Sequence, residues 1–148
     1  MKKILFVDDE PFYCKQYFRK LKEHFNSEYS LHLIDRAEAG LQYILDNQDL
    51  ALVILDVMMP SPPDVDRALT DDGKSTGIWL LRQIRETAVK RNVKVFLLSN
   101  RGIEDIKKEA EKIMYPNDLI QMGHKPQISA RDLPNWIQAF LDRPLSRL

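Results

Sequence analysis

The chain has 148 residues, enough for one domain that buries most of its apolar surface without disulfides or metal ions as staples. Its 22 acidic and 22 basic residues balance, so no overall field draws it to nucleic acid or to a membrane, and neither is expected as a partner. The single cysteine, Cys14, cannot form an internal disulfide, which favours a reducing compartment and predicts a cytoplasmic protein. No stretch approaches the roughly 20 consecutive apolar residues that a membrane-spanning helix needs.

Short apolar runs alternate along the chain with longer segments of helical period, a pattern typical of βα units around a parallel sheet. Asp8 and Asp9 end the first run after a few residues, which fits a buried strand better than a signal peptide. The runs predict five strands, at residues 3–7, 29–34, 51–55, 93–98 and 119–122. The third and fourth runs are almost continuously apolar, as central strands covered on both faces should be.

Apolar residues at helical spacing predict five helices between and after these strands, at residues 14–25, 37–45, 77–84, 102–114 and 132–141. Pro116 ends the fourth helix. Asp132 is the expected N-cap of the fifth, because Pro134 is tolerated only in a first turn. Together the elements predict an α/β fold, a flavodoxin-like doubly wound parallel sheet of strand order 2-1-3-4-5 with five helices.

The whole chain, residues 1–148, is predicted to form one domain. One loop, residues 61–76, is rich in Pro and Asp and long for a βα connection, which favours an insertion with a function of its own. We expect it to form a mobile flap close to Asp56 that affects access or partner choice. After the fifth helix, residues 143–148 are too few to form a further domain, so none is expected.

Polar side chains follow four of the predicted strands at the point where each strand ends. Asp8 and Asp9 follow the first strand, Asp56 the third, Ser99 the fourth and Lys125 the fifth. Because the carboxyl ends of parallel strands meet at one edge of the sheet, these side chains should converge on one cleft.

Three carboxylates close together repel one another unless one is protonated or a cation joins them. Mg²⁺ prefers oxygen ligands and is commonly held by one or two carboxylates together with a phosphate oxygen. Asp56 is then a candidate nucleophile, since aspartate can form an acyl phosphate. The Lys125 ammonium and the Ser99 hydroxyl are suited to neutralise charge on a transferred phosphoryl group.

Four segments in this order resemble the receiver domains of two-component response regulators, in particular the stand-alone, chemotaxis-regulator-like type. They are residues 6–10 (FVDDE), 52–60 (LVILDVMMP), 97–99 (LLS) and 125–126 (KP). The resemblance covers nearly the whole chain and implies a phosphoprotein of a phosphorelay that signals by conformational change. It implies a sensor histidine kinase or a phosphotransfer protein as phosphoryl donor and a separate downstream protein as target.

The same resemblance assigns roles to the clustered residues. Asp56 is implied to be the phosphoacceptor, and Ser99 and Lys125 are implied to bind the phosphoryl group. Asp9, Asp56 and the backbone carbonyl of Met58 are implied to contact Mg²⁺, with Asp8 acting through water. No organic cofactor is implied, and the protein would catalyse only its own phosphorylation and dephosphorylation, so it is not expected to be an enzyme in the usual sense.

The chain departs from the family pattern at several positions. Met122 stands where the family commonly has Tyr or Phe, three residues before the lysine, and Asn100 replaces the usual small residue after Ser99. Gln127 replaces a common Phe, and the loop ending near Gly77 is about a dozen residues longer than in the family. We therefore expect the fourth helix to carry more of any surface change than residue 122.

Other interpretations stay open at this point. A pseudo-receiver would keep the fold as a protein-interaction module without being phosphorylated. A phosphatase of the haloacid dehalogenase kind also uses Asp, Mg²⁺ and Lys, but its Asp-x-Asp signature is absent from both Asp8-Asp9-Glu10 and Asp56-Val57-Met58. Asp8 and Asp9 by themselves fit a strand ending with a helix cap, and Ser99 fits a local cap.

Overall fold

A five-stranded parallel sheet of order β2-β1-β3-β4-β5 forms the centre of the protein in the computed structural model, which describes residues 1–146. The strands are β1 Lys2–Val7, β2 Tyr29–Ile34, β3 Leu50–Leu55, β4 Lys94–Ser99 and β5 Ile120–His124. The α-helices are α1 Tyr13–Phe25, α2 Ala37–Asp46, α3 Thr76–Arg91, α4 Ile103–Glu111 and α5 Leu133–Asp142. The predicted fold class and strand order are confirmed. Among the described helices, none combines the length and the apolarity that crossing a membrane requires.

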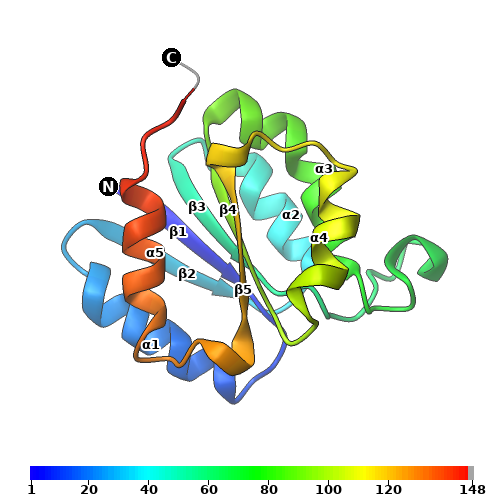
Figure 1. Cartoon of the computed structure of the whole chain (residues 1–148), viewed down its shortest axis with the longest axis horizontal. Helices are drawn as coiled ribbons and strands as arrows, with labels where there is room; N and C mark the ends of the chain where they lie inside the picture. The colour runs from blue at the N-terminus through cyan, green and yellow to red at the C-terminus, as the bar shows by residue number, and fades with distance from the viewer. Residues whose placement is uncertain (147–148) are drawn as a thin grey trace.

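Two separate cores hold the helices on the two faces of the sheet (Figure 1). Along β1, Ile4 and Phe6 face α1 and α5, whereas Leu5 and Val7 face α2 and α3. This alternation is the period of two expected of a strand covered on both sides. The aromatic side chains lie mainly in the α1 and α5 core, where Phe96 packs against Phe140 with ring centroids 6.1 Å apart.

The predicted strands match the observed ones to within two residues at each end. The largest difference is β5, which begins at Ile120 and continues to His124, because its ladder with β4 continues through the pairs Leu98 with Gly123 and Ser99 with His124. The predicted strand ends too early because it was placed on a run of apolar residues. Glycine and histidine are not apolar in this sense, although their backbones can pair with a neighbouring strand.

Three predicted helix boundaries differ from the structure. The third helix continues seven residues beyond position 84, to Arg91. The fourth helix ends at Glu111, and Met114 has a positive φ of 61°, which a continuing right-handed helix excludes. Arg85 of α3 instead donates to the backbone oxygens of Ile113 and Met114. Asp132 makes no side-chain cap at the start of α5.

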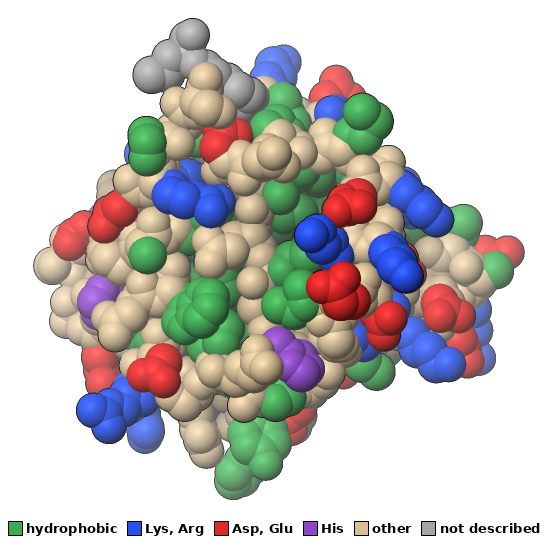
Figure 2. Space-filling model, viewed as in Figure 1, with side chains coloured by type: hydrophobic (Ala, Val, Ile, Leu, Met, Phe, Trp, Pro, Cys, Tyr) green, Lys and Arg blue, Asp and Glu red, His purple; other side chains and the backbone are tan. Residues whose placement is uncertain are grey.

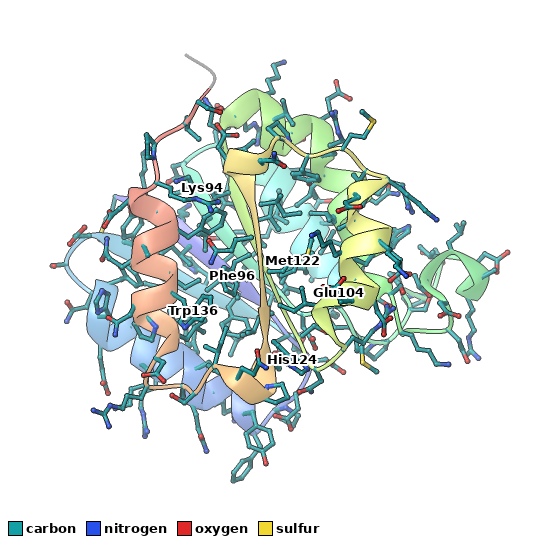
Figure 3. All side chains as sticks on the ribbon, in the orientation of Figure 1. Lys94, Phe96, Glu104, Met122, His124 and Trp136 are labelled. Atoms are coloured by element: carbon teal, nitrogen blue, oxygen red, sulfur yellow. The ribbon has the colours of Figure 1, made fainter. Side chains whose placement is uncertain are left out.

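The first turn of α5 is held differently. Asp132 already has a helical backbone conformation. Its N–H donates to the Ser129 hydroxyl at 3.2 Å. The other end of α5 is capped by Lys94 of β4, whose buried ammonium donates to the carbonyls of Phe140, Leu141 and Arg143 (Figure 3). A charged residue is thereby accommodated inside a core strand, since its protons all have acceptors.

The predicted insertion projects from the edge of the molecule, in green at the right of Figure 1. It contains a short 3₁₀ helix, η1 Arg67–Thr70, whose first residue follows Asp66 as a side-chain cap. Thr70 is fully buried and donates to the Ser61 hydroxyl and the Arg67 carbonyl. The segment is therefore anchored at its base, while its exposed Leu69 faces solvent. Its proposed mobility stays a prediction.

Gly77 seats the start of α3 directly against the end of β3. A Cβ atom at this position would lie 2.2 Å from the backbone oxygen of Asp56 and 2.6 Å from the Cα of Val57. The Gly77 N–H donates to the Val57 carbonyl at 2.8 Å, and the Thr76 hydroxyl donates to the Met59 carbonyl at 2.6 Å. The backbone that follows Asp56, from its carbonyl to Met59, is thus fixed by the first turn of α3.

We predict that Gly77→Ala destabilises the fold by about 2 to 4 kcal/mol, because the colliding atoms are backbone and cannot move aside cheaply. Gly102→Ala is the matched control, since a Cβ at Gly102 would meet no heavy atom within 4 Å. Urea unfolding followed by circular dichroism measures both. Equal midpoints for the two variants would contradict the close contact.

Candidate functional site

Three carboxylates gather at the carboxyl edge of the sheet. Asp8 follows β1 and Asp56 follows β3, and the ladder continues between them, because the Asp56 N–H donates to the Val7 carbonyl at 2.9 Å. Asp8 is 1% exposed and Asp56 4%, whereas Asp9 is half-buried. One oxygen from each of Asp8, Asp9 and Asp56 lies within 4.8 Å of the others. The convergence expected from a parallel sheet is observed.

Lys125 reaches into this cluster from the end of β5. Its ammonium lies 2.8 Å from Oδ2 of Asp8, to which it donates, and 3.5 Å from Oδ1 of Asp56. Its side chain is only 9% exposed. Lys125 is therefore not a solvated surface lysine, and the structure joins it to both buried carboxylates.

The turn after β5 determines where Lys125 points. Gly123 allows β5 to pass closely, since a Cβ there would lie 2.6 Å from Ile128 and 2.9 Å from Phe96. The buried Tyr17 hydroxyl of α1 donates to the Ile128 carbonyl at 2.5 Å, which ties the turn to the opposite helix. Tyr17 lies in the helix predicted over residues 14–25, but the contact between its hydroxyl and this turn has no local sequence signal.

The cluster carries excess negative charge when all its members are ionised, because three carboxylates face one ammonium. Burial, and then the charge of Asp8, raises the pKa of Asp56 to about 7, although Lys125 opposes this. Burial and Asp8 likewise raise the pKa of Asp9. For Lys125, burial acts to lower the pKa, but Asp56 and Asp8 outweigh it and raise the pKa. The Lys125 ammonium therefore stays charged, whereas the Asp56 carboxyl is partly protonated near neutral pH.

The donor set fits a hard divalent cation. All three cluster residues offer carboxylate oxygens, which Mg²⁺ prefers, and the two excess negative charges match a charge of +2. Asp8 already binds the Lys125 ammonium through Oδ2 and the Glu10 N–H through Oδ1. Asp9 and Asp56 are consequently the carboxylates with more freedom to bind an ion directly.

Ser99 ends β4 and is fully buried at the same edge. Its Oγ accepts the backbone N–H of Arg101 at 3.1 Å, a local hydrogen bond of the kind the capping interpretation expects. The hydroxyl proton is a separate donor, so this bond leaves Ser99 able to donate to a ligand. The capping and phosphoryl-binding interpretations are therefore compatible.

Two cavities open beside the cluster. One of about 510 Å³ is lined by Asp8, Asp9, Cys14, Asp35 and Arg36, among others. The other, of about 330 Å³, is lined by Glu10, Tyr13, Tyr17, Asn100, Lys125 and Pro126. The insertion contributes no lining residue to either cavity, so the expected flap does not cover them. Burial, followed by Asp8 and Glu10, raises the pKa of the Cys14 thiol to about 11, which keeps the thiol protonated.

Glu10 has a role that the sequence analysis missed. Its Oε2 accepts the N–H groups of Phe12 and Tyr13, which satisfies backbone donors at the start of α1. An acidic residue just before a helix is a signal that could have been used. The aromatic rings of Phe12 and Tyr13 are left exposed, and Tyr13 lines the second cavity.

The face formed by α4, β5 and α5 lies next to the cluster. Figure 2 shows hydrophobic side chains along β5, with Lys, Arg, Asp and Glu side chains over α4. Met122 extends from β5 toward α4, and Trp136 of α5 is 42% exposed (Figure 3). Met122 packs at the edge of the core formed by α2, α3 and α4.

No protein-family model matches this sequence, and no curated protein matches it. Solved structures do match over nearly the whole chain. The chain is 22% identical to a beryllofluoride-activated DrrB receiver domain, with a TM-score of 0.62 and coverage of 97% of this chain and 99% of that chain.

A DNA-binding response regulator of the LuxR family from Staphylococcus aureus is 17% identical, with a TM-score of 0.68 and coverage of 96% and 100% respectively. The chemotaxis protein CheY4 of Vibrio cholerae is 16% identical, with a TM-score of 0.65 and coverage of 95% and 98%. The chain thus has the receiver-domain fold of two-component response regulators. At these identities the likeness concerns the fold.

We predict that the metal-free protein becomes less stable as pH rises from about 4 to about 7. The pKa of Asp56 is raised in the folded state to about 7 from 3.8, so the folded state binds one more proton in this window. The stabilisation is complete below about 4 and is lost as pH rises through about 7, with a slope of at most about 1.4 kcal/mol per pH unit.

Asp56→Asn should flatten this slope and be more stable than the parent at pH 8, because it removes the buried charge. The exposed Asp64→Asn is the control and should keep the parent slope. Urea unfolding at several pH values in EDTA measures the slopes. A parent protein whose stability rises steadily from pH 4 to 7 would refute the burial argument.

We predict that millimolar Mg²⁺ raises the melting temperature by binding the folded state only. Asp9→Ala should remove most of the increase, since Asp9 is the most accessible carboxylate of the cluster. Asp35→Ala is the matched control, because Asp35 lines the same cavity but lies outside the cluster. Thermal scans with and without Mg²⁺ that coincide for the parent would rule out the metal site.

Proposed function

We propose that this protein is a response regulator of a two-component phosphorelay that accepts a phosphoryl group on Asp56 in a Mg²⁺-dependent reaction. The donor would be a phosphohistidine of a sensor histidine kinase or of a phosphotransfer protein, and the signal would pass to a separate protein. The observation that carries the proposal is the Lys125 ammonium, which lies within 3.5 Å of Asp56 and 2.8 Å of Asp8 in a buried cluster. The receiver fold supports it.

Asp56 is the proposed nucleophile. Its carboxylate oxygen would attack phosphorus, forming an O–P bond while the N–P bond of the donor breaks and its electron pair returns to the imidazole nitrogen. Only the ionised carboxylate is nucleophilic, and the raised pKa means that the apo site holds part of Asp56 protonated near neutral pH. Any added positive charge near Asp56 favours the reactive form.

Asp9, Asp56 and the backbone carbonyl of Met58 would hold Mg²⁺, with Asp8 behind a water molecule, and the bound ion would neutralise charge on the phosphoryl oxygens. Lys125 is already held in place by its hydrogen bond to Asp8, so its ammonium needs little rearrangement to bind a phosphoryl oxygen. Ser99 would donate its hydroxyl proton to another oxygen while it keeps accepting from Arg101.

We predict that incubation with acetyl phosphate and Mg²⁺ adds a single phosphoryl group, seen as one adduct in the intact mass. Asp56→Asn should abolish the adduct, and EDTA should prevent it. Lys125→Met should reduce its formation by roughly tenfold or more, because the buried cluster loses the cation that neutralises the transferred group.

Asp64→Asn serves as the control and should be labelled like the parent, since Asp64 lies on the exposed insertion. A parent protein that gains no adduct, although Mg²⁺ binds, would identify a pseudo-receiver and reject the proposal. Catalytic turnover of p-nitrophenyl phosphate would point to a phosphatase instead, and an adduct mapped to another residue would reject Asp56.

A further inference from the structure

Arg101 lies at the centre of a polar cluster next to the proposed phosphorylation site. Its Nη1 atom is 2.8 Å from the Ser75 hydroxyl, 3.1 Å from the Lys74 carbonyl and 2.9 Å from Oε2 of Glu109. The Ser75 hydroxyl in turn donates to Oε1 of Glu109 at 2.9 Å. These contacts connect the end of the insertion, the β4–α4 loop and α4, and we call Ser75, Arg101 and Glu109 the polar latch.

The latch is the main polar attachment of a weakly anchored helix. α4 has nine residues, of which only Ile106 and Ala110 are buried, and Gly102 gives it no side-chain cap. Ser75 is 5% exposed, and the side chains of Arg101 and Glu109 are 21% and 34% exposed. Losing these contacts would therefore release α4 more readily than it would release a helix with a broad buried face.

The two sides of the latch are attached to different parts of the site. Ser75 immediately precedes α3, whose Gly77 is packed against the backbone of Asp56 and cannot shift independently of it. Arg101 is joined to Ser99, because its backbone N–H donates to the Ser99 hydroxyl. A movement of Ser99 toward a group on Asp56 must therefore carry Arg101 with it, while Ser75 stays in place.

We infer that the polar latch couples the phosphorylation state of Asp56 to α4, with Arg101 as the positioning residue. This inference rests on the proposed function. In the unphosphorylated protein the latch is closed and holds α4 against the start of α3. When Ser99 donates to the phosphoryl group, the turn from Ser99 to Arg101 moves as a unit, the contacts to Ser75 and Glu109 break, and α4 is released.

The latch gives the site a route to α4 that does not need the Tyr or Phe commonly found at the position of Met122. The methionine side chain of Met122 is flexible and has no hydroxyl, so it is a poor reporter of the position of Ser99. The latch instead senses the position of the 99–101 turn through hydrogen bonds and an ion pair, which depend steeply on distance and direction. Coupling can thus reach α4 without a conformational change at residue 122.

The test is amide hydrogen exchange of α4 in Mg²⁺, with and without beryllofluoride, in the otherwise unchanged chain. In the parent, beryllofluoride should speed exchange at residues 103–111 by on the order of five- to tenfold, the effect expected for a partly exposed ion-pair cluster. In Glu109→Gln, exchange should already be fast, and beryllofluoride should add little. Ser75→Ala opens the same latch from its other side and should behave alike.

Affinity for beryllofluoride gives a readout that a purely structural role would not change. Because coupling is reciprocal, opening the latch in advance should tighten beryllofluoride binding by a similar factor in Glu109→Gln and Ser75→Ala. Glu111→Gln removes a carboxylate from the exposed end of the same helix and should match the parent in both measurements.

The outcomes separate the latch from the proposed function. Amide shifts at Asp56 and Val57 report whether beryllofluoride binds at all, and their absence would overturn both. If beryllofluoride binds but exchange in α4 is unchanged, the latch is wrong and phosphorylation of Asp56 still stands. A Glu109→Gln variant that keeps the full beryllofluoride response, or binds it with unchanged affinity, would also overturn the latch.

Discussion

The ion pair between Lys125 and Asp8 is the constraint on which the site depends. It joins β5 to β1, and two strands, β3 and β4, lie between them in the sheet. Both side chains are almost fully buried, so the charge of each is compensated by the other. Removing one partner of such a pair typically lowers the free energy of unfolding by about 3 to 5 kcal/mol. The pair links β1 to β5 at the carboxyl edge of the sheet, beside Asp56. Its single ammonium does not balance the charges of the three carboxylates in the cluster. A site with this imbalance is suited to take up a cation and then a phosphoryl group.

The backbone around the cluster leaves little room for adjustment. Close approaches at Gly77 and Gly123 fix the positions of α3 and β5, and three central strands contribute side chains that are almost completely buried. Packed interiors respond to a new charge by changing between discrete arrangements at their periphery, because their cores do not deform smoothly. The 99–101 turn and α4 are the peripheral elements attached to the cluster, so they are where a change at Asp56 can become visible at the surface.

The fold and the cluster were predictable because each depends on a pattern that the chain carries locally. Five apolar runs imply a parallel sheet, and parallel strands bring the residues after Val7, Leu55 and His124 to one edge, whatever the intervening helices contain. The latch was not predictable, because Ser75, Arg101 and Glu109 are brought together by the tertiary positions of three segments separated by 26 and 34 positions in the sequence. The missing cap at Asp132 has a different origin, since Asp132 itself adopts the helical backbone conformation and its own N–H is bound by the Ser129 hydroxyl.

The strength of the latch fits the role inferred for it. Ion pairs as exposed as Arg101 and Glu109 contribute about 1 kcal/mol or less, and the nearly buried Ser75 adds hydrogen bonds of about 1 kcal/mol each. The total is a few kcal/mol at most, which is the size of the free-energy gap between two exchanging conformations of a protein. A stronger attachment would hold α4 in place even after phosphorylation, and a weaker one would leave it released in both states. Because two of the three side chains are partly exposed, salt also weakens the latch, so the resting position of α4 depends on ionic strength while the buried pair of Lys125 and Asp8 does so far less.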